Sequence, residues 1–237
     1  MGIPFCARWI GHGRGYGTHA AHRGRNGRTA GLGDRGWEGT AMKLGIVSDV
    51  HCEAALLETA AREMVEAGAE EILLAGDAHF EYRFSNEVTE VIRAFDMRYI
   101  SGNHEWRLMG PTGQRAREAP HVRAANRDFV EAIPTTIDTV VDGRSLRMIH
   151  GCPWPPYDRY LNPADPDYAR CGDLGVDILV LGHTHLPHLQ RVGGTLVINP
   201  GSLAFSQDPG GFDLMTYALL DASTDEVTLV RRPKPTS

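Results

Sequence analysis

The sequence is poor in cysteine and lacks long apolar runs. Its 237 residues include four cysteines, Cys6, Cys52, Cys152 and Cys171, and no two stand in a Cys-x-x-Cys spacing. A disulfide-stapled secreted domain needs a much denser set, so we expect a reduced, cytoplasmic protein. The apolar runs are far shorter than the ~20 residues that a membrane-spanning helix requires. An integral membrane protein is therefore excluded.

The sequence also lacks an excess of positive charge. The formal net charge is −6 and the isoelectric point lies near 6.0. Proteins that bind nucleic acid by neutralising its phosphates are basic. A nucleic-acid partner is therefore not expected, and a nuclease is disfavoured for the same reason.

Residues 1–41 differ in composition from the rest of the chain. They hold 11 of the 27 glycines and six arginines, but only two acidic residues. A chain this rich in glycine loses too much backbone entropy on ordering. We expect a disordered leader or a translation start at Met42, with a transit peptide or a nucleic-acid-binding arm as alternatives. Residues 42–237, which carry a net charge of −10, would form the folded domain, and removing the leader should change neither folding nor activity.

From Lys43 onward the pattern predicts a single α/β domain. Three repeats of an apolar run followed by a helix-spaced stretch indicate a parallel sheet, and a strand-rich second half follows. The predicted strands are 43–48, 71–75, 97–101, 136–141, 145–149, 177–181, 189–192, 195–198, 216–221 and 226–231, and the predicted helices are 53–67, 86–95 and 123–131. The economical architecture is a four-layer α/β/β/α sandwich, with helices outside two packed sheets.

Five predicted strands end in a polar cluster. The clusters are Asp49-Val-His51, Gly76-Asp77, Gly102-Asn103-His104-Glu105, His150-Gly151 and Gly182-His183-Thr184-His185. Sites in open α/β sheets form outside the carboxyl ends of the strands, so these clusters should converge. Asp, Asn and His without thiolate suit Mn²⁺, Fe, Ni²⁺, Zn²⁺ or Co²⁺. Asp49 and His51 can reach one ion only from an irregular turn, and the glycines before Asp77, Asn103 and His183 would let the backbone turn tightly.

These ordered motifs resemble those of the calcineurin-like metallophosphoesterases, and most of all the compact YfcE-type phosphodiesterases of bacteria and archaea. The resemblance covers nearly all of residues 43–231 and includes Asn199-Pro-Gly-Ser202. It implies a dinuclear site: Asp49, His51, Asp77 and His185 would hold one ion, and Asp77 would bridge to a second ion held by Asn103, His150 and His183. Two divalent ions, with Mn²⁺ expected first, would clamp the phosphate and supply a bridging hydroxide as nucleophile.

The same resemblance implies a role for the residues next to Asn103. His104 would stand over the phosphate and either protonate the leaving alkoxide or stabilise its charge. Glu105 would orient His104 or an arginine, or else serve only as a solvated or capping carboxylate. His79, two residues past Asp77, is expected in a surface loop.

Other residues near the motifs are open to a plain structural interpretation. Cys52 and Cys152 lie beside His51 and His150 and are expected to be buried, inert thiols. The aromatic loop 154–157 with Tyr160 either walls the substrate pocket or covers a sheet edge.

The chain departs from the large Ser/Thr phosphatases in its second motif. The segment Gly76-Asp77-Ala-His-Phe80-Glu-Tyr-Arg83 lacks their second Asp and adjacent Arg, and His104 stands where the small phosphodiesterases often have Cys. The leading hypothesis is a metal-dependent phosphoesterase that acts on small phosphodiesters, without a membrane. A phosphomonoesterase or a nucleotide or protein phosphatase with the same site, and a non-catalytic interaction scaffold, are the alternatives. Association into a homo-oligomer is left open.

Overall fold

The computed structural model describes residues 42–235. The ten strands in this range form two five-stranded mixed sheets. The strand order is β10-β9-β1-β2-β3 in the first sheet and β4-β5-β6-β8-β7 in the second. The strands are β1 (Lys43–Val47), β2 (Glu71–Leu74), β3 (Arg98–Tyr99), β4 (Thr136–Val141), β5 (Arg144–Ile149), β6 (Ile178–Val180), β7 (His188–Val192), β8 (Thr195–Asn199), β9 (Leu214–Asp221) and β10 (Glu226–Pro233). All ten predicted strands are present, and the expectation about residues 1–41 lies outside the described residues.

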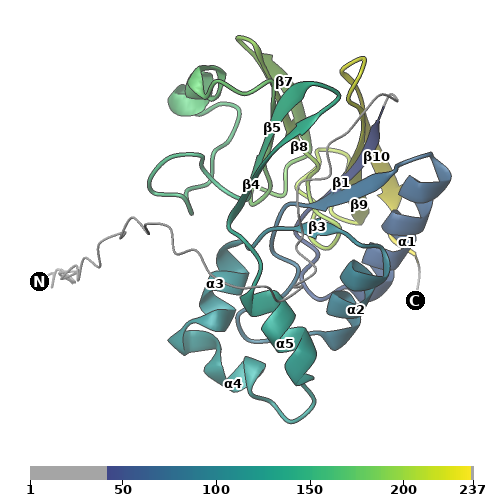
Figure 1. Ribbon diagram of the computed structural model, residues 1–237, viewed down its shortest axis with the longest axis vertical. Helices are drawn as coiled ribbons and strands as arrows, with labels where there is room; N and C mark the ends of the chain where they lie inside the picture. Colours follow the sequence, from purple (N-terminus) through teal and green to yellow (C-terminus); the bar gives the residue numbers. More distant parts are fainter. Residues whose placement is uncertain (1–41, 236–237) are drawn as a thin grey trace, which may run out of the picture. The chain divides into compact units, whose positions relative to one another are not determined.

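The parallel part of the first sheet arises from the predicted strand–helix repeats. Strand β1 pairs in parallel with β2, and β2 with β3, whereas β9 and β10 are antiparallel. Helices α1 (Ala54–Glu66) and α2 (Asn86–Ala94) connect the parallel strands and cover one face of the sheet (Figure 1). Helix α1 buries Leu57, Ala60, Ala61 and Met64, the i, i+3, i+4, i+7 spacing of an amphipathic helix.

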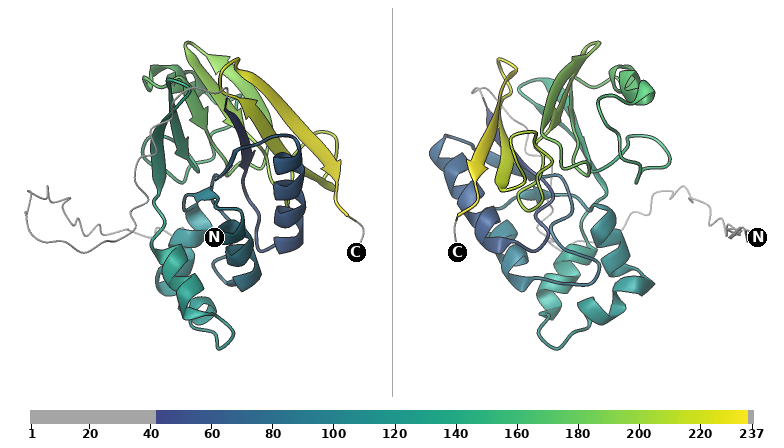
Figure 2. Two further views of the ribbon diagram at one scale, coloured as in Figure 1. Left: turned by 45° about the vertical axis from the view of Figure 1, so that its right-hand side comes forward. Right: turned by 180° about the vertical axis from the view of Figure 1, so that it is seen from behind.

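Three apolar layers hold the sandwich together. Side chains of both sheets, such as Ile46 and Met148, meet in a core between the sheets. A second layer lies beneath α1 and α2. The outer face of the second sheet is covered by the loop after β5 and its 3₁₀ helix η2 (Pro166–Asp173), through Cys152, Tyr168 and Cys171. Figure 2 shows the two sheets packed against each other and the helices outside the first sheet, which confirms the expected sandwich.

Four short helical segments were not predicted: η2, and three segments at one end of the first sheet. Helices α3 (Asn103–Met109) and α4 (Gln114–Arg117), with the 3₁₀ helix η1 (Pro111–Gly113) between them, lie near the predicted α5 (Ala124–Glu131) at one end of the first sheet (Figure 1). Helix α3 begins at Asn103, so its first turn consists of residues of the polar cluster Gly102-Asn103-His104-Glu105. Leu108 of α3, Ala116 of α4 and Val130 of α5 pack into one small core.

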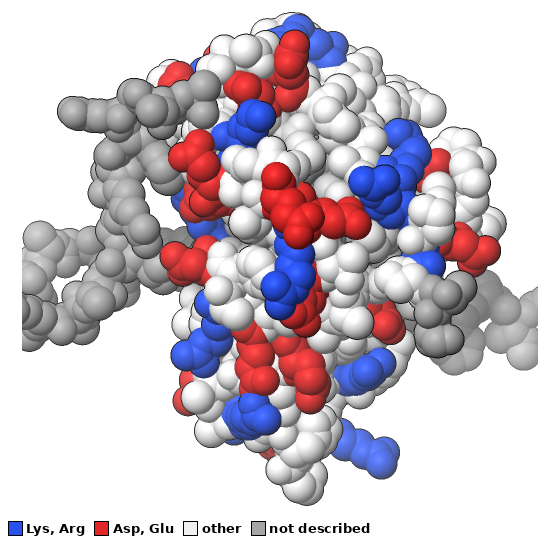
Figure 3. All heavy atoms as spheres, turned by 90° about the vertical axis from the view of Figure 1, so that its right-hand side faces the viewer, with Lys and Arg blue, Asp and Glu red and all other residues white. Residues whose placement is uncertain are grey.

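The face of the molecule that includes α1 carries charges of both signs. Acidic and basic side chains are interspersed there without a continuous basic field (Figure 3), and pairs such as Arg62 with Glu58 neutralise one another. Within residues 42–235, no helix is long and apolar enough to cross a bilayer.

Candidate metal centre

The five polar clusters converge at one edge of the sandwich, as predicted. Asp49, Asp77 and Asn103 follow β1, β2 and the segment of β3, while His150 and His183 follow β5 and β6 of the other sheet. Backbone hydrogen bonds carry the strand pairing on into the loops: the amide of Asp49 donates to Gly76 at 3.0 Å, and that of Gly182 donates to His150 at 2.8 Å. The loops are therefore fixed relative to one another by the sheets from which they emerge.

Two groups of side chains present atoms that could bind an ion. Each group places three such atoms within 4.8 Å of one another: Asp49, His51 and His185 form the first group, and Asp77, His150 and His183 form the second. Asp49 Oδ1 lies 3.1 Å from His185 Nε2, and Asp77 Oδ2 lies 3.0 Å from His150 Nε2. His104 approaches both groups, since it forms a further such set with His51 and Asp77.

The backbone at these positions adopts a conformation that side chains disfavour. Five residues have positive φ angles: Asp49 at 55°, His51 at 49°, Asp77 at 53°, His183 at 66° and His185 at 57°. Such strain persists only where the surroundings over-determine it, and it gathers at functional sites. The irregular turn expected for Asp49 and His51 is confirmed.

The glycines that precede these residues act in two different ways. Gly76 has φ +97° and makes the tight turn predicted for it. Gly102 lacks a positive φ, but a Cβ there would lie 2.1 Å from Asp77 Oδ1. Gly102 is therefore needed because its backbone packs closely against a site carboxylate. The sequence analysis expected only a tight turn at this glycine.

Three histidine rings are oriented by backbone carbonyls. His150 Nδ1 lies 2.6 Å from the carbonyl oxygen of Ala75, His183 Nε2 lies 2.9 Å from that of Asp158, and His185 Nδ1 lies 2.9 Å from that of Phe205. A ring nitrogen facing a carbonyl carries the proton, because the carbonyl can only accept. In the neutral ring the other nitrogen then presents its lone pair to the centre of the site, which is how metal-binding histidines are held.

Several buried polar atoms of the site lack a hydrogen-bond partner. Asp49 Oδ1, Asn103 Oδ1 and His150 Nε2 are among them. Buried polar atoms are nearly always satisfied in native proteins, so three such atoms in one place call for a ligand. A divalent cation accepts lone pairs from these atom types, and the donor set therefore fits a metal centre.

Electrostatics gives the same indication. Burial would raise the pKa of Asp49, but the neighbouring His185 and His150 outweigh it and hold the carboxyl below its usual range. Burial would lower the pKa of His150, but the carboxylates of Asp77 and Asp49 raise it to about 10. Burial lowers the pKa of His51 to about 4. The negative charge of the two buried carboxylates therefore favours a positive charge in the site. A bound cation would supply that positive charge.

Glu105 does not orient His104, which corrects that part of the sequence interpretation. Its buried carboxylate accepts hydrogen bonds from the backbone amides of Asp77 at 2.9 Å, His79 at 2.8 Å and Gly102 at 2.8 Å. Both oxygens are occupied in this way, so Glu105 caps α3 and ties two site loops together. The capping alternative was the correct one.

The partner of His104 is Glu81, whose carboxylate contacts His104 Nδ1. Sequence reasoning missed Glu81, because it lies in an irregular segment with no periodicity. The only available signal was the departure of Phe80-Glu81 from the second motif of the large phosphatases. The contact leaves His104 Nε2 pointing toward the site, 3.8 Å from Asp77 Oδ2.

The expectation of a surface location for His79 is wrong. The side chain is fully buried, its Nδ1 accepts a hydrogen bond from the amide of Ser85, and its ring stacks on Phe84 at 4.6 Å. The chain after Asp77 turns inward beneath α2, and burial lowers the pKa of His79 to about 3. This neutral histidine packs under the loop and does not join the two groups.

Cys52 and Cys152 are buried, as predicted, and burial raises the pKa of the Cys52 thiol to about 11.

The Asn199-Pro-Gly-Ser202 segment holds two of the site loops. Asn199 donates from Nδ2 to the carbonyl of Gly182 at 2.8 Å, and Ser202 Oγ donates to the carbonyl of Asp49 at 2.7 Å. The motif therefore supports the residues that face the site.

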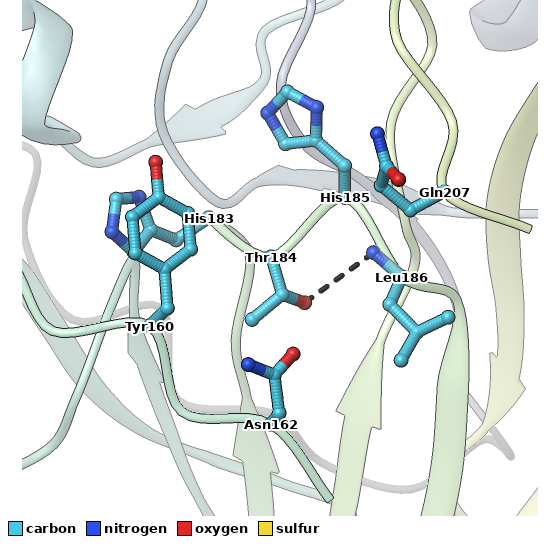
Figure 4. Close-up of a pocket in the computed structure, with 7 residues that line it drawn as sticks. All are labelled: Tyr160, Asn162, His183, Thr184, His185, Leu186 and Gln207. Carbon is cyan, nitrogen blue, oxygen red and sulfur yellow. Dashed lines mark hydrogen bonds between the residues drawn. The ribbon is translucent and has the colours of Figure 1, made fainter.

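The residues of the aromatic loop lie in two different environments. Trp154 packs against the core on the outer face of the second sheet, and Arg170 lies 4.2 Å above its ring. Tyr160 instead stacks on His183, with ring centroids 3.9 Å apart, and lines an open pocket beside the two groups (Figure 4).

The two-sheet sandwich thus brings buried Asp and His side chains to one edge, in groups that could hold metal ions. A family model described as the calcineurin-like phosphoesterase superfamily domain matches residues 42–225. The chain belongs to this superfamily, as its motifs predicted. It is a metallophosphoesterase, a hydrolase of phosphate esters.

Individual relatives agree with this assignment. The chain is 25% identical to the probable metallophosphoesterase YsnB of Bacillus subtilis, over 67% of this chain and 88% of that protein. Its fold is similar to a metallophosphoesterase of Sphaerobacter thermophilus (TM-score 0.64, 21% identity, 82% of this chain and 90% of the other). It is also similar to an archaeal phosphodiesterase (TM-score 0.55, 21% identity, 81% of this chain and 100% of the other).

Proposed function

We propose that this protein hydrolyses small phosphodiesters at a centre of two divalent ions. One ion would be held by Asp49, His51, Asp77 and His185, and the other by Asp77, Asn103, His150 and His183. Mn²⁺ is the first choice, because the donor set combines carboxylate, amide and imidazole without thiolate. Fe, Ni²⁺, Zn²⁺ and Co²⁺ suit the same donors.

The observation that carries this proposal is the pair of adjacent ligand groups. Each holds one carboxylate and two imidazoles within 4.8 Å, and the orphaned atoms of Asp49, Asn103 and His150 all belong to residues of the proposed ligand set. Two bound ions would polarise a phosphate and lower the pKa of a bound water.

The side chains around the ions would supply orientation and a proton. The Glu81 carboxylate on His104 Nδ1 fixes that ring so that Nε2 faces the site. From there Nε2 would donate a proton to the oxygen of the leaving group. The carbonyls of Ala75, Asp158 and Phe205 keep three of the ligand rings from rotating.

The diester preference is supported by the space next to the ligands. A phosphodiester carries a second ester group that stays on phosphorus, and an enzyme for diesters must give it room. The pocket lined by Tyr160 opens beside His183 and His185 and offers such room.

The test is turnover of bis-p-nitrophenyl phosphate beside p-nitrophenyl phosphate. Protein stripped with a chelator should hydrolyse neither, and Mn²⁺ should restore hydrolysis of the diester above that of the monoester. Preference for the monoester would overturn the diester assignment and favour the phosphomonoesterase alternative. Absence of turnover with all five metals would contradict the enzymatic proposal and favour a scaffold.

A further inference from the structure

The pocket beside the ligand groups has a lining of its own. It measures about 520 Å³ and is lined by Tyr160, Asn162, His183, Thr184, His185, Leu186 and Gln207. We call it the Tyr160 pocket. A volume of this size is within the range of small-molecule sites. Because His183 and His185 belong to its wall, a phosphate at the metal centre could extend a substituent directly into it.

Tyr160 offers an aromatic surface in a fixed orientation. Its ring lies nearly parallel to that of His183, at 19° and 3.9 Å between centroids (Figure 4). The residue is nevertheless 60% exposed, so His183 covers only part of it. The neighbouring Arg159 anchors the loop through ion pairs of 2.7 Å to Asp165 and to Asp167. A planar group could therefore stack on Tyr160 without first ordering the loop.

Apart from the two proposed metal ligands, His183 and His185, the polar side chains that line the pocket carry hydroxyl or carboxamide groups. Asn162 and Gln207 are exposed and contribute carboxamides, each a donor and an acceptor side by side. Such carboxamides match the amide-like edges of nucleobases. None of the lining residues is Lys or Arg, so the pocket provides no cationic side chain for a second phosphate or other anion. Its occupant should be uncharged, planar and rich in hydrogen-bonding groups.

We propose that the Tyr160 pocket binds the nucleoside of a nucleotide phosphodiester, with the base stacked on Tyr160. This inference rests on the proposed function and names its substrate class. His104 does not line the pocket and packs instead against His51 and Phe80, so the nucleoside is the group that stays on phosphorus. Water adds to phosphorus, the bond to the leaving alcohol breaks, and that oxygen takes a proton. The products are a nucleoside monophosphate and an alcohol.

Two diesters with the same leaving group test the pocket. Thymidine 5′-(p-nitrophenyl phosphate) and methyl p-nitrophenyl phosphate both release p-nitrophenolate and differ only in the group that is retained. With Mn²⁺, the wild type should show a kcat/KM at least tenfold higher for the thymidine ester. Base stacking on an aromatic side chain supports an effect of this size.

The variants separate stacking from a general disturbance of the site. Tyr160→Ala should lower the ratio of kcat/KM for the thymidine ester to kcat/KM for the methyl ester about tenfold, while Tyr160→Phe should retain the preference. Tyr157→Ala is the matched control, because Tyr157 is an exposed tyrosine of the same loop that does not line the pocket. An equal kcat/KM for the two esters in the wild type, or an unchanged ratio in Tyr160→Ala, would overturn the proposal.

Failure of the proposed function gives a different result. In that case neither ester is hydrolysed by the metal-loaded wild type. Calorimetric titration with thymidine 5′-monophosphate then tests the pocket by itself. About tenfold weaker binding to Tyr160→Ala than to the wild type would support the nucleoside site, and equal or absent binding would contradict it.

Discussion

The two sides of the metal centre are built from different chemistry. On the His104 side, a carboxylate from Glu81 holds a histidine, and the Phe80 ring stands edge-on to that histidine at 5.3 Å. On the Tyr160 side, an aromatic ring and two carboxamides surround open space. The first side is suited to moving a proton and the second to holding a neutral group. Because different loops supply them, substitutions should affect one side without the other.

The largest effect is expected where both sides meet. Asp77→Asn removes the carboxylate that contributes to both proposed ion sites, and it should lower turnover of every substrate at least a thousandfold while the fold remains intact. Steady-state kinetics with circular dichroism checks this. The matched control is Asp138→Asn, an exposed carboxylate paired with Arg147, which should behave as the wild type. Turnover above a tenth of the wild-type rate in Asp77→Asn would contradict a shared ligand.

His104→Ala should affect only the proton side. An unactivated alcohol needs protonation as it leaves and p-nitrophenolate does not, so the dinucleoside phosphate TpT should lose a factor of about 10²–10⁴ and the nitrophenyl esters far less. The preference for the thymidine ester over the methyl ester should survive. Equal losses on TpT and on the nitrophenyl esters would show that His104 binds phosphate instead of donating a proton.

Glu105→Gln should weaken the support of the loops on the proton side. The amide keeps one accepting oxygen but turns an NH₂ group toward buried backbone donors, which should cost about 1–3 kcal/mol of unfolding free energy. Urea unfolding measures the loss, with the exposed Glu66→Gln at the end of α1 as control. A variant as stable as the wild type would mean that the three amide contacts do not hold the loops.

The smallest effect is expected from Glu81→Gln. The amide retains the shape of the side chain but loses the charge on His104 Nδ1, so TpT hydrolysis should fall about tenfold or less. The thymidine-to-methyl ratio should not change, because Glu81 lies on the other side. A shift of that ratio would break the separation of the two sides.

The strands and the convergence of the polar clusters could be predicted from the sequence because both obey short-range rules. Apolar runs set the strands, and the residues that follow them, such as Asp49 and His183, must lie at one sheet edge. Helix α3 was missed because its first residues, Asn103 to Glu105, are site residues and carry no apolar periodicity. Sequence reasoning could place the polar clusters and the turns at His51 and Gly76, but not the helix that begins at Asn103.

The partners of those side chains depended on loop geometry that no pattern encodes. Glu81 reaches His104, and Glu105 reaches the amide of Asp77, only because the segment after β2 turns inward. The same turn buries His79, which lies in a polar stretch of sequence. Tyr160 was identified as an aromatic residue with two open roles, and the structure stacks it on His183 beside an open pocket.

The number of bound ions tests the central claim most directly. Protein stripped with a chelator, incubated with Mn²⁺ and dialysed should contain two ions per chain by elemental analysis, and its melting temperature should rise on loading, because a ligand that binds only the folded state stabilises it. Asp77→Asn should hold fewer ions. One ion or none in the wild type, at saturating Mn²⁺, would contradict the dinuclear centre on which both sides depend.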